Sequence, residues 1–365
     1  MGDRSNMKNQ ARIWTIRTGH GQASGVLLGI GALVGACVAG YALFTIFGSP
    51  GSASVNQNDE LPVEQGVGSV DEPERVEIAP TETIEEILGA VQVYVQNEQF
   101  AQATTVLEHA AEQYPDDQEL QLSLGDLYTM QEKYHDAYLA YVSAIEIGPA
   151  SAKAEFTAGT LANMLNQLEA SEIHFGLAMR IDSQNADTPI FLAAVQMKMN
   201  KLDEAKKNLA IAGKMAPGNG RVFAMSSEIA MRENKPRIAL QQIRKARAIE
   251  PEVLAWLLAE AKVLKRGGQP EEALSLLASL GQAEREILEV AYVLAECYGM
   301  LGRAGDSASF LMDIYPKHTG DGRLAFEIAL WLDRSNEDAE AMEWAKRAAG
   351  LGHPSAAKWV ESNGG

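Results

Sequence analysis

The sequence predicts an all-α protein in which about eight helix-turn-helix repeats stack as a solenoid after a single transmembrane helix. Three observations predict it: an uncharged apolar stretch at 25–47, prolines separated by a constant interval or twice that interval, and small residues at fixed positions between those prolines. Proline cannot continue a helix, so each of these prolines ends one. The spaced prolines are Pro115, Pro149, Pro217 and Pro251.

The N-terminal residues 1–24 form a basic tail, and the apolar stretch at 25–47 follows it. The tail carries four basic residues and one acidic residue, and the stretch carries no charge. At about 1.5 Å per residue, a helix of this length crosses a hydrocarbon layer of roughly 30 Å. Basic residues before the span place the N-terminus in the cytoplasm. We therefore expect a single-pass protein of the cytoplasmic (inner) membrane, with its repeats in the periplasm or another extracytoplasmic space.

Other interpretations of the apolar stretch remain open. Cleavage near residues 51–53 would make it a signal peptide, and Cys37 ends a sequence that is similar to a bacterial lipoprotein box. Residues 25–35 also hold two G-x-x-x-G pairs, which would let two such helices approach closely and self-associate. The alternative is that these glycines are the small residues common in membrane helices.

Residues 48–82 are rich in Gly, Ser, Pro, Asp and Glu and show no apolar period. Such a segment cannot bury enough apolar surface to offset its ordering entropy, so it predicts an acidic flexible linker. A docking tail is the alternative. Thr83 and Glu86 then stand three residues apart, as in a capping box, and predict that the first repeat helix begins at Ile84.

The clearest repeat is the segment 118–151. Its key residues, in order, are Leu124, Gly125, Tyr128, Ala137, Tyr141, Ala144 and Pro149. This pattern resembles the tetratricopeptide repeat, in which W-x2-L-G-x2-Y, A-x3-F and P recur about every 34 residues. Gln121 stands where the leading Trp is expected. The resemblance implies pairs of antiparallel helices that bury their apolar faces only by stacking on neighbouring pairs.

Gly125 and Ala137 are expected where the two helices of a pair cross, because a larger side chain there would push the helix axes apart. Tyr128 and Tyr141 are expected to fill the space that the small residues leave. The same register runs through 83–355 and predicts equivalent small or terminating residues at Gly159, Ala205, Pro217, Ala239, Pro251 and Ala341. The last repeat also resembles the related Sel1-type repeat, and residues 356–365 are expected to form a capping helix and tail.

The charge of the chain argues against a nucleic-acid partner. The formal net charge is −18, and because residues 1–24 carry +3, the other residues carry −21. A protein region with this much negative charge repels the phosphate backbone of nucleic acids. The sequence contains none of the common catalytic or phosphate-binding motifs, and its six histidines share no metal-ligand spacing. We therefore expect no enzyme activity, cofactor or metal.

The resemblance implies that a protein or peptide ligand lies in a concave groove lined by the first helix of each pair. The apolar residues that the register places there are Phe156, Phe191, Met197, Met225 and Met231. The basic residues that it places there are Lys198, Arg221, Arg232, Lys262 and Arg266. Methionine suits a surface that adapts to varied ligands, and a basic run suits an acidic partner segment. The alternatives are packing between repeats for the first set and a solvated face for the second.

These observations predict a membrane-anchored interaction scaffold that docks a partner protein or peptide of the cell envelope. The alternative is a periplasmic, chaperone-like protein that holds unfolded or translocating clients on the methionines.

Overall fold

The computed structural model describes residues 83–364, and throughout this range the chain forms helices and turns without a strand. The predicted N-terminal tail, membrane span and acidic linker lie outside the described residues. Among helices within 83–364, none combines the length and apolar character needed to cross a bilayer. The all-α prediction is thus confirmed for this part of the chain.

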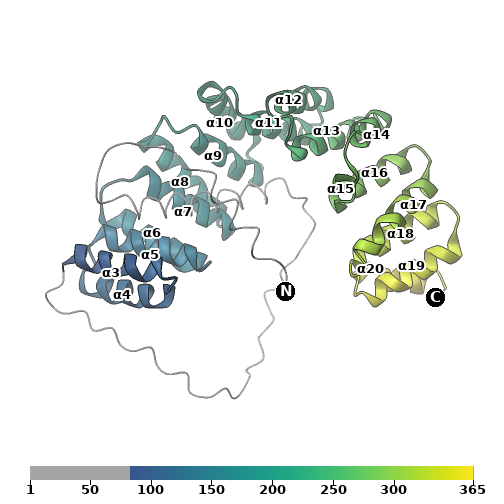
Figure 1. The fold of residues 1–365 in the computed structure, drawn as a ribbon. Coiled ribbons are helices and arrows are strands. Elements are labelled where there is room, and N and C mark those ends of the chain that lie inside the picture. The colour runs from purple at the N-terminus through teal and green to yellow at the C-terminus, as the bar shows by residue number, and fades with distance from the viewer. Residues whose placement is uncertain (1–82, 365) are drawn as a thin grey trace, which may run out of the picture. The chain divides into compact units, whose positions relative to one another are not determined.

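The described helices divide into two compact units, one ending at Asp182 and the other beginning at Ser183. The first unit consists of three helix pairs, each packed on the next (Figure 1). Its helices are α3 (Ile84–Gln96), α4 (Phe100–Gln113), α5 (Gln118–Met130), α6 (Tyr134–Ile147), α7 (Ala152–Met164) and α8 (Leu168–Ile181).

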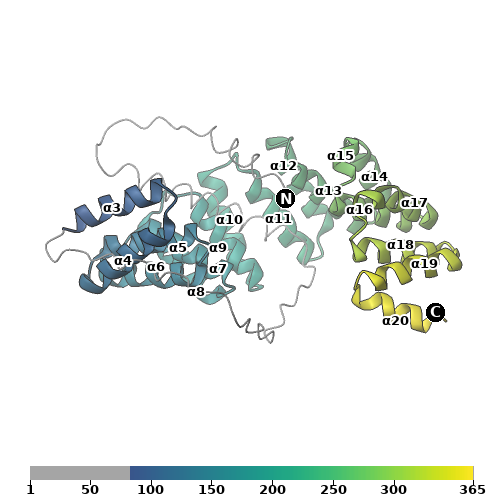
Figure 2. The same ribbon diagram turned by 60° about the horizontal axis from the view of Figure 1, so that its bottom comes forward.

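The second unit continues the pairing, and consecutive helices from α9 to α14 lie side by side (Figure 2). Its helices are α9 (Asp187–Lys198), α10 (Leu202–Met215), α11 (Gly220–Arg232), α12 (Pro236–Ile249), α13 (Leu254–Arg266), α14 (Pro270–Ala278), α15 (Gln282–Arg285), α16 (Leu288–Met300), α17 (Ala304–Ile314), α18 (Gly322–Arg334), α19 (Asp338–Gly350) and α20 (Pro354–Ser362). A 3₁₀ turn, Tyr315–Lys317, follows α17.

A residue with positive φ recurs at intervals of one repeat length, at the turn within each helix pair. These residues are Glu98, Glu132, Asn166, Asn200, Asn234, Gly268, Gly302 and Asn336, with φ between 58° and 77°. A left-handed residue at this point lets the second helix fold back on the first. The register therefore continues through eight turns without insertion or deletion. Only two of these turns have the glycine that most readily adopts a positive φ.

The first helix begins as predicted. Thr83 accepts a hydrogen bond from the backbone N–H of Glu86, and the Glu86 carboxylate accepts one from the backbone N–H of Thr83 at 2.8 Å. The predicted terminators also hold, because α6, α10 and α12 each end two residues before Pro149, Pro217 and Pro251 respectively.

Small residues stand at the helix crossings, as predicted. A Cβ atom on Gly125 would lie 2.7 Å from Tyr141 Cδ2, and one on Gly159 would lie 3.0 Å from Phe175 Cδ1. The alanines at the facing position are fully buried: Ala103, Ala137, Ala205, Ala239, Ala273 and Ala341 each have 0% exposure. Helix pairs can approach closely only where the side chains between them are this small.

Serine replaces glycine or alanine at three crossings, and in each the hydroxyl bonds to the backbone of the crossing helix. Ser171 donates to the Gly159 carbonyl at 2.6 Å, Ser227 to the Ala239 carbonyl at 2.9 Å, and Ser307 to the Ala295 carbonyl at 2.7 Å. The buried hydroxyl is thereby satisfied, which explains why the close approach survives the substitution.

Two features near the C-terminus shape the second unit. Helix α14 ends at Ala278, shortly before Gly281, and is 9 residues long where α10 and α12 have 14. Helix α20 begins at Pro354, and its Trp359 packs against the apolar cluster formed by α16 to α19. The last pair is thus covered by an additional short helix rather than left open.

Candidate functional site

We call the side chains of α9, α11, α13, α16 and α18 that reach solvent the first-helix face. The sequence places most of the predicted groove residues on these helices, and Phe156 on α7 of the first unit. One contact joins two of them directly: Arg232 Nη1 donates a hydrogen bond to the Met197 carbonyl at 2.6 Å, which ties the end of α11 to the end of α9.

Most of the predicted apolar groove residues lie in the interior. Phe191, Met197, Met225 and Met231 are buried, with exposures from 0% to 8%. Phe156 is half-buried and meets the edge of Phe175 at 5.3 Å between ring centroids. Packing between repeats therefore accounts for the apolar character of these residues, and their part in partner binding remains a prediction that their burial does not favour.

The predicted basic residues reach solvent, but two of them are already paired with carboxylates. Arg232 lies 2.5 Å from Glu228 one turn earlier on α11, and Lys262 on α13 lies 2.5 Å from Glu289 on α16. Partial burial also lowers the pKa of Lys198 on α9. The positive charge of this face is therefore partly neutralised within the chain.

Arg221 and Arg266 differ from these residues. Arg221 is half-buried at the start of α11, and Arg266 is exposed at the end of α13. Neither guanidinium has an ion pair with a carboxylate among residues 83–364. These two are the cations of the predicted set that are open to an external carboxylate.

Sequence reasoning missed the carboxylates of α16. Glu289 and Glu296 accept from Lys262 and Lys265, so two ion pairs connect α13 to α16 along the first-helix face. The signal was available: a Lys on one first helix is followed 27 or 31 residues later by a Glu on the next. Spacings close to the repeat length bring side chains of successive first helices together.

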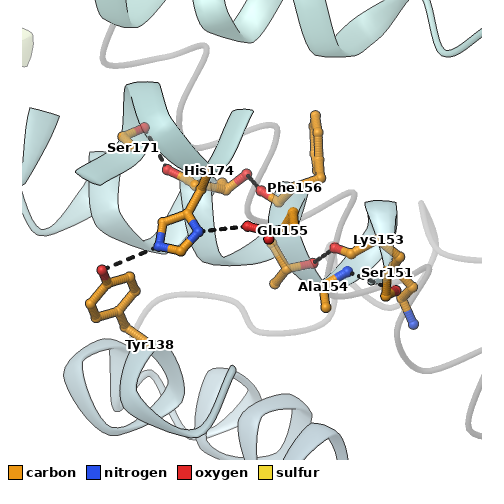
Figure 3. A network of polar contacts seen from close by, with 11 residues as sticks. Tyr138, Ser151, Lys153, Ala154, Glu155, Phe156, Ser171 and His174 are labelled. Atoms are coloured by element: carbon orange, nitrogen blue, oxygen red, sulfur yellow. Dashed lines mark hydrogen bonds and ion pairs between the residues drawn. The ribbon is translucent and has the colours of Figure 1, made fainter. Parts of the chain in front are cut away.

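A polar network links three helices of the first unit (Figure 3). His174 Nδ1 on α8 lies 2.7 Å from Glu155 Oε2 on α7, and His174 Nε2 lies 3.3 Å from the Tyr138 hydroxyl on α6. The side chains of Glu155 and His174 are 5% and 13% exposed. With a neutral ring, Nδ1–H donates to the carboxylate and Nε2 accepts from the tyrosine, so every member is satisfied.

This network connects three helices, and its geometry differs from that of a catalytic triad. Both nitrogens of His174 are engaged by Glu155 and Tyr138, and the nearby Ser171 hydroxyl donates instead to the Gly159 carbonyl. A nucleophile needs a base within hydrogen-bond reach, and Ser171 does not have His174 in that role.

The described residues contain neither a cluster of metal-binding side chains nor a thiol with a lowered pKa. Within 83–364, no three side chains of the metal-binding types converge on one point. Cys297 is buried, and this burial raises the pKa of its thiol to about 11. The thiol is therefore protonated at neutral pH, which makes it a packing residue rather than a nucleophile.

Comparisons with known proteins bear on the fold. Neither a protein-family model nor a curated protein matches this sequence. Among solved structures, a tetratricopeptide repeat protein from Parabacteroides merdae aligns with a TM-score of 0.56 at 13% identity, over 67% of this chain and 98% of its own. PilW, described as a type IV pilus biogenesis factor, aligns with a TM-score of 0.47 at 20% identity, over 57% of this chain and 96% of its own. The alignment with the Parabacteroides merdae protein shows that the described part of this chain has the fold of tetratricopeptide repeat proteins.

Proposed function

We propose that this protein is a membrane-anchored scaffold that docks a partner protein or peptide of the cell envelope on its first-helix face. The observation that carries the proposal is the arrangement of Arg221 and Arg266. Both are held on helices that follow the constant repeat register, both reach solvent, and neither is neutralised by a carboxylate of the described chain.

Charged groups on rigid elements suit the recognition of an acidic segment. A guanidinium forms paired hydrogen bonds with a carboxylate, and it stays charged at any physiological pH. Because each arginine stands on a helix, its backbone is already ordered before a partner binds. Binding therefore costs less conformational entropy than it would if the arginines stood on a flexible loop. The first-helix face thus offers defined positions for an acidic partner, although Arg232 and Lys262 first have to exchange their internal carboxylates.

The chaperone-like alternative rested on a methionine-lined groove. Met197, Met225 and Met231 are buried in the second unit, so they offer no adaptable apolar surface to an unfolded client. No other observation favours that alternative, and the scaffold is the function that we propose.

A pull-down from solubilised native membranes tests the docking. The double variant Arg221→Glu with Arg266→Glu should lose the partner that the unchanged full-length protein captures. Lys346→Glu with Lys358→Glu is the matched control, because both lysines are exposed on α19 and α20 and have no ion pair among the described residues. If both double variants capture the same proteins as the unchanged chain, the first-helix face is not the docking site.

The proposed membrane placement has its own test. It is supported by the uncharged stretch 25–47 and the basic tail before it. A C-terminal alkaline phosphatase fusion should be active and a C-terminal green fluorescent protein fusion dark, because the C-terminus is proposed to be extracytoplasmic. The reverse pattern would contradict the orientation.

A further inference from the structure

A groove of about 540 Å³ opens in the second unit between the second helices α10 and α12, with α11 as its floor. Its apolar lining includes Leu209, Val222, Phe223 and Ile238, and Lys206 and Lys235 contribute charged side chains. Ile238 is 47% exposed, and Ile211 on α10 is 42% exposed. The volume lies within the range of roughly 300–1,000 Å³ that is typical of ligand sites. None of the residues predicted to bind a partner on the first helices lines this second-helix groove.

The repeat register shows why the space is open. Two repeats further along the chain, the positions of Tyr138, Glu155 and His174 of the first unit are taken by Lys206, Phe223 and Gln242, which line the groove. In the first unit these positions hold the bonded polar network that closes the space between α6 and α8. In the groove, Lys206 instead donates to Asp203 and Glu233, and Phe223 has no polar group to bridge the space.

The next interface along the chain closes the same space in another way. One repeat further on, the equivalent residues are Leu240, Leu257 and Leu276, all of which pack against the apolar cluster of α13, α14 and α16. One interface is thus filled by a polar network and another by leucines. Between α10 and α12 the register instead places a lysine, a phenylalanine and a glutamine around an opening.

The surroundings of the groove are basic in an acidic protein. Residues 201–250 contain 11 Lys and Arg against 5 Asp and Glu, a net charge of +6, while the whole chain carries −18. Four exposed cations of α10 and α12 have no carboxylate partner among residues 83–364: Lys207, Lys214, Arg237 and Lys245. Lys245 also lies over the ring of Phe223, with Nζ 5.6 Å from the ring centroid.

The lysines at one end of the groove are already paired with carboxylates of the chain. Glu233 accepts from Lys206 and from Lys235, the latter at 3.0 Å, and Asp203 lies 3.1 Å from Lys206. The positive charge that remains for a ligand is therefore that of the four unpaired cations on α10 and α12, of which Lys245 contacts the lining residue Phe223.

We propose that this second-helix groove binds an acidic, amphipathic segment of a partner protein. Its apolar side chains contact Phe223 and Ile238, and its carboxylates pair with Lys207 and Lys245. A short segment is favoured over an extended anionic surface, such as a membrane or nucleic acid, because the rest of the chain carries a net charge of −24 and repels such a surface. The site adds a second docking surface to the one on the first helices.

Fluorescence anisotropy with synthetic peptides tests this assignment on the full-length protein in detergent. Each peptide has about 14 residues, a common length for a helix in a globular protein. The probe repeats Glu and Leu at helical spacing. One comparison peptide replaces every Glu by Lys, and another replaces every Leu by Ser. We expect the Glu/Leu peptide to bind saturably, and both comparison peptides to bind at least about tenfold more weakly, because the groove requires charge and apolar contact together.

Variants assign the binding to the groove. The single variant Ile238→Glu should weaken binding of the Glu/Leu peptide by roughly tenfold, and so should the double variant Lys207→Glu with Lys245→Glu. Ile173→Glu is the matched control, since Ile173 is an exposed isoleucine, 62% accessible, on the second helix α8 of the first unit. All three variants should keep the circular dichroism spectrum and the unfolding midpoint of the unchanged protein, because every substituted side chain is exposed.

Three outcomes would overturn the proposal: no saturable binding of the Glu/Leu peptide, equal binding of the Lys/Leu peptide, or indifference to the groove variants. Two further measurements examine other occupants. Loss of phosphatidylglycerol vesicle binding in Ile238→Glu would assign the groove to lipid, and a change of sedimentation coefficient in that variant would assign it to a second copy of the chain. Either result would contradict a partner segment.

Discussion

Arg244 Nε donates a hydrogen bond to Glu260 Oε1 at 2.8 Å, which joins α12 to α13 through a buried carboxylate. Glu260 is only 3% exposed and occupies the repeat position that Leu124 holds four repeats earlier. Arg247 Nη1 binds the other carboxylate oxygen. The two arginines thus supply the partners that a buried charge requires, and they explain how a Glu replaces the apolar residue of the repeat motif.

Replacing Glu260 by Ala should lower the free energy of unfolding of the second unit by about 2–3 kcal/mol. Loss of one partner of a buried ion pair commonly costs more, but Arg244 is half exposed and can be solvated again. Urea unfolding followed by circular dichroism measures the change. Glu260→Leu, which restores the apolar residue of the motif, should be clearly less harmful, and equal losses for the two variants would contradict the ion-pair explanation.

Replacing Gly125 by Ala should destabilise the first unit by about 1–3 kcal/mol, because the added Cβ meets the Tyr141 ring at 2.7 Å. Gly89 provides the matched control, since it also lies within a helix but a Cβ added there would have no atom within 4 Å. Gly89→Ala should stabilise the protein by up to about 1 kcal/mol through helix propensity. The account of the crossing fails if both substitutions act in the same direction.

Replacing Glu132 by Asn should raise the free energy of unfolding by about 0.5–1 kcal/mol. Glu132 has φ of 61°, a left-handed conformation that Asn adopts more readily than Glu. Three of the equivalent turns, between residues 166 and 234, have Asn at this position. Glu132→Ala removes the charge but keeps the unfavourable backbone, so it should bring no gain. A gain in the Ala variant equal to that in the Asn variant would mean that charge, not backbone conformation, is responsible.

The pH dependence of stability should carry a contribution from Glu233. Its hydrogen bonds with Lys206 and Lys235 hold the pKa of this carboxyl below its ordinary value of 4.5. A carboxyl whose pKa is lower in the folded chain stabilises the fold above its unfolded pKa, and this contribution is lost as pH falls through its folded pKa. The difference in unfolding free energy between the unchanged chain and Glu233→Gln should therefore be present at pH 7 and shrink below pH 4.5. A difference that stays constant across this range would exclude the ionised pair as its source.

Sequence reasoning was successful where one residue determines the local geometry. Gly125 and Ala137 are needed at a crossing, Pro149 ends a helix, and Thr83 caps one, so the place of each follows from the sequence alone. The constant repeat length then determined which residues share a position in different repeats. Periodicity and helix ends are local properties, and local properties can be read from one sequence.

The candidate site was harder to predict because its character depends on which side chains meet between repeats. The register placed Met225 on the first helix α11, but packing against neighbouring helices buries it completely. The same register placed Lys262 correctly on α13 without revealing that Glu289 neutralises it. The groove at Phe223 was missed, because a gap between second helices appears only when equivalent residues of different repeats are compared in space.

Site-specific photo-cross-linking in native membranes tests whether a partner protein docks on the first-helix face. A benzoylphenylalanine at position 255 of α13, one repeat length after Arg221, and one at position 346 of α19 as control both replace exposed side chains and leave Arg221 and Arg266 in place. We expect a discrete adduct with another envelope protein from position 255, reduced by an excess of the same chain without benzoylphenylalanine, and none from position 346. The absence of a protein adduct at 255, or the same adduct at both positions, would contradict the scaffold function.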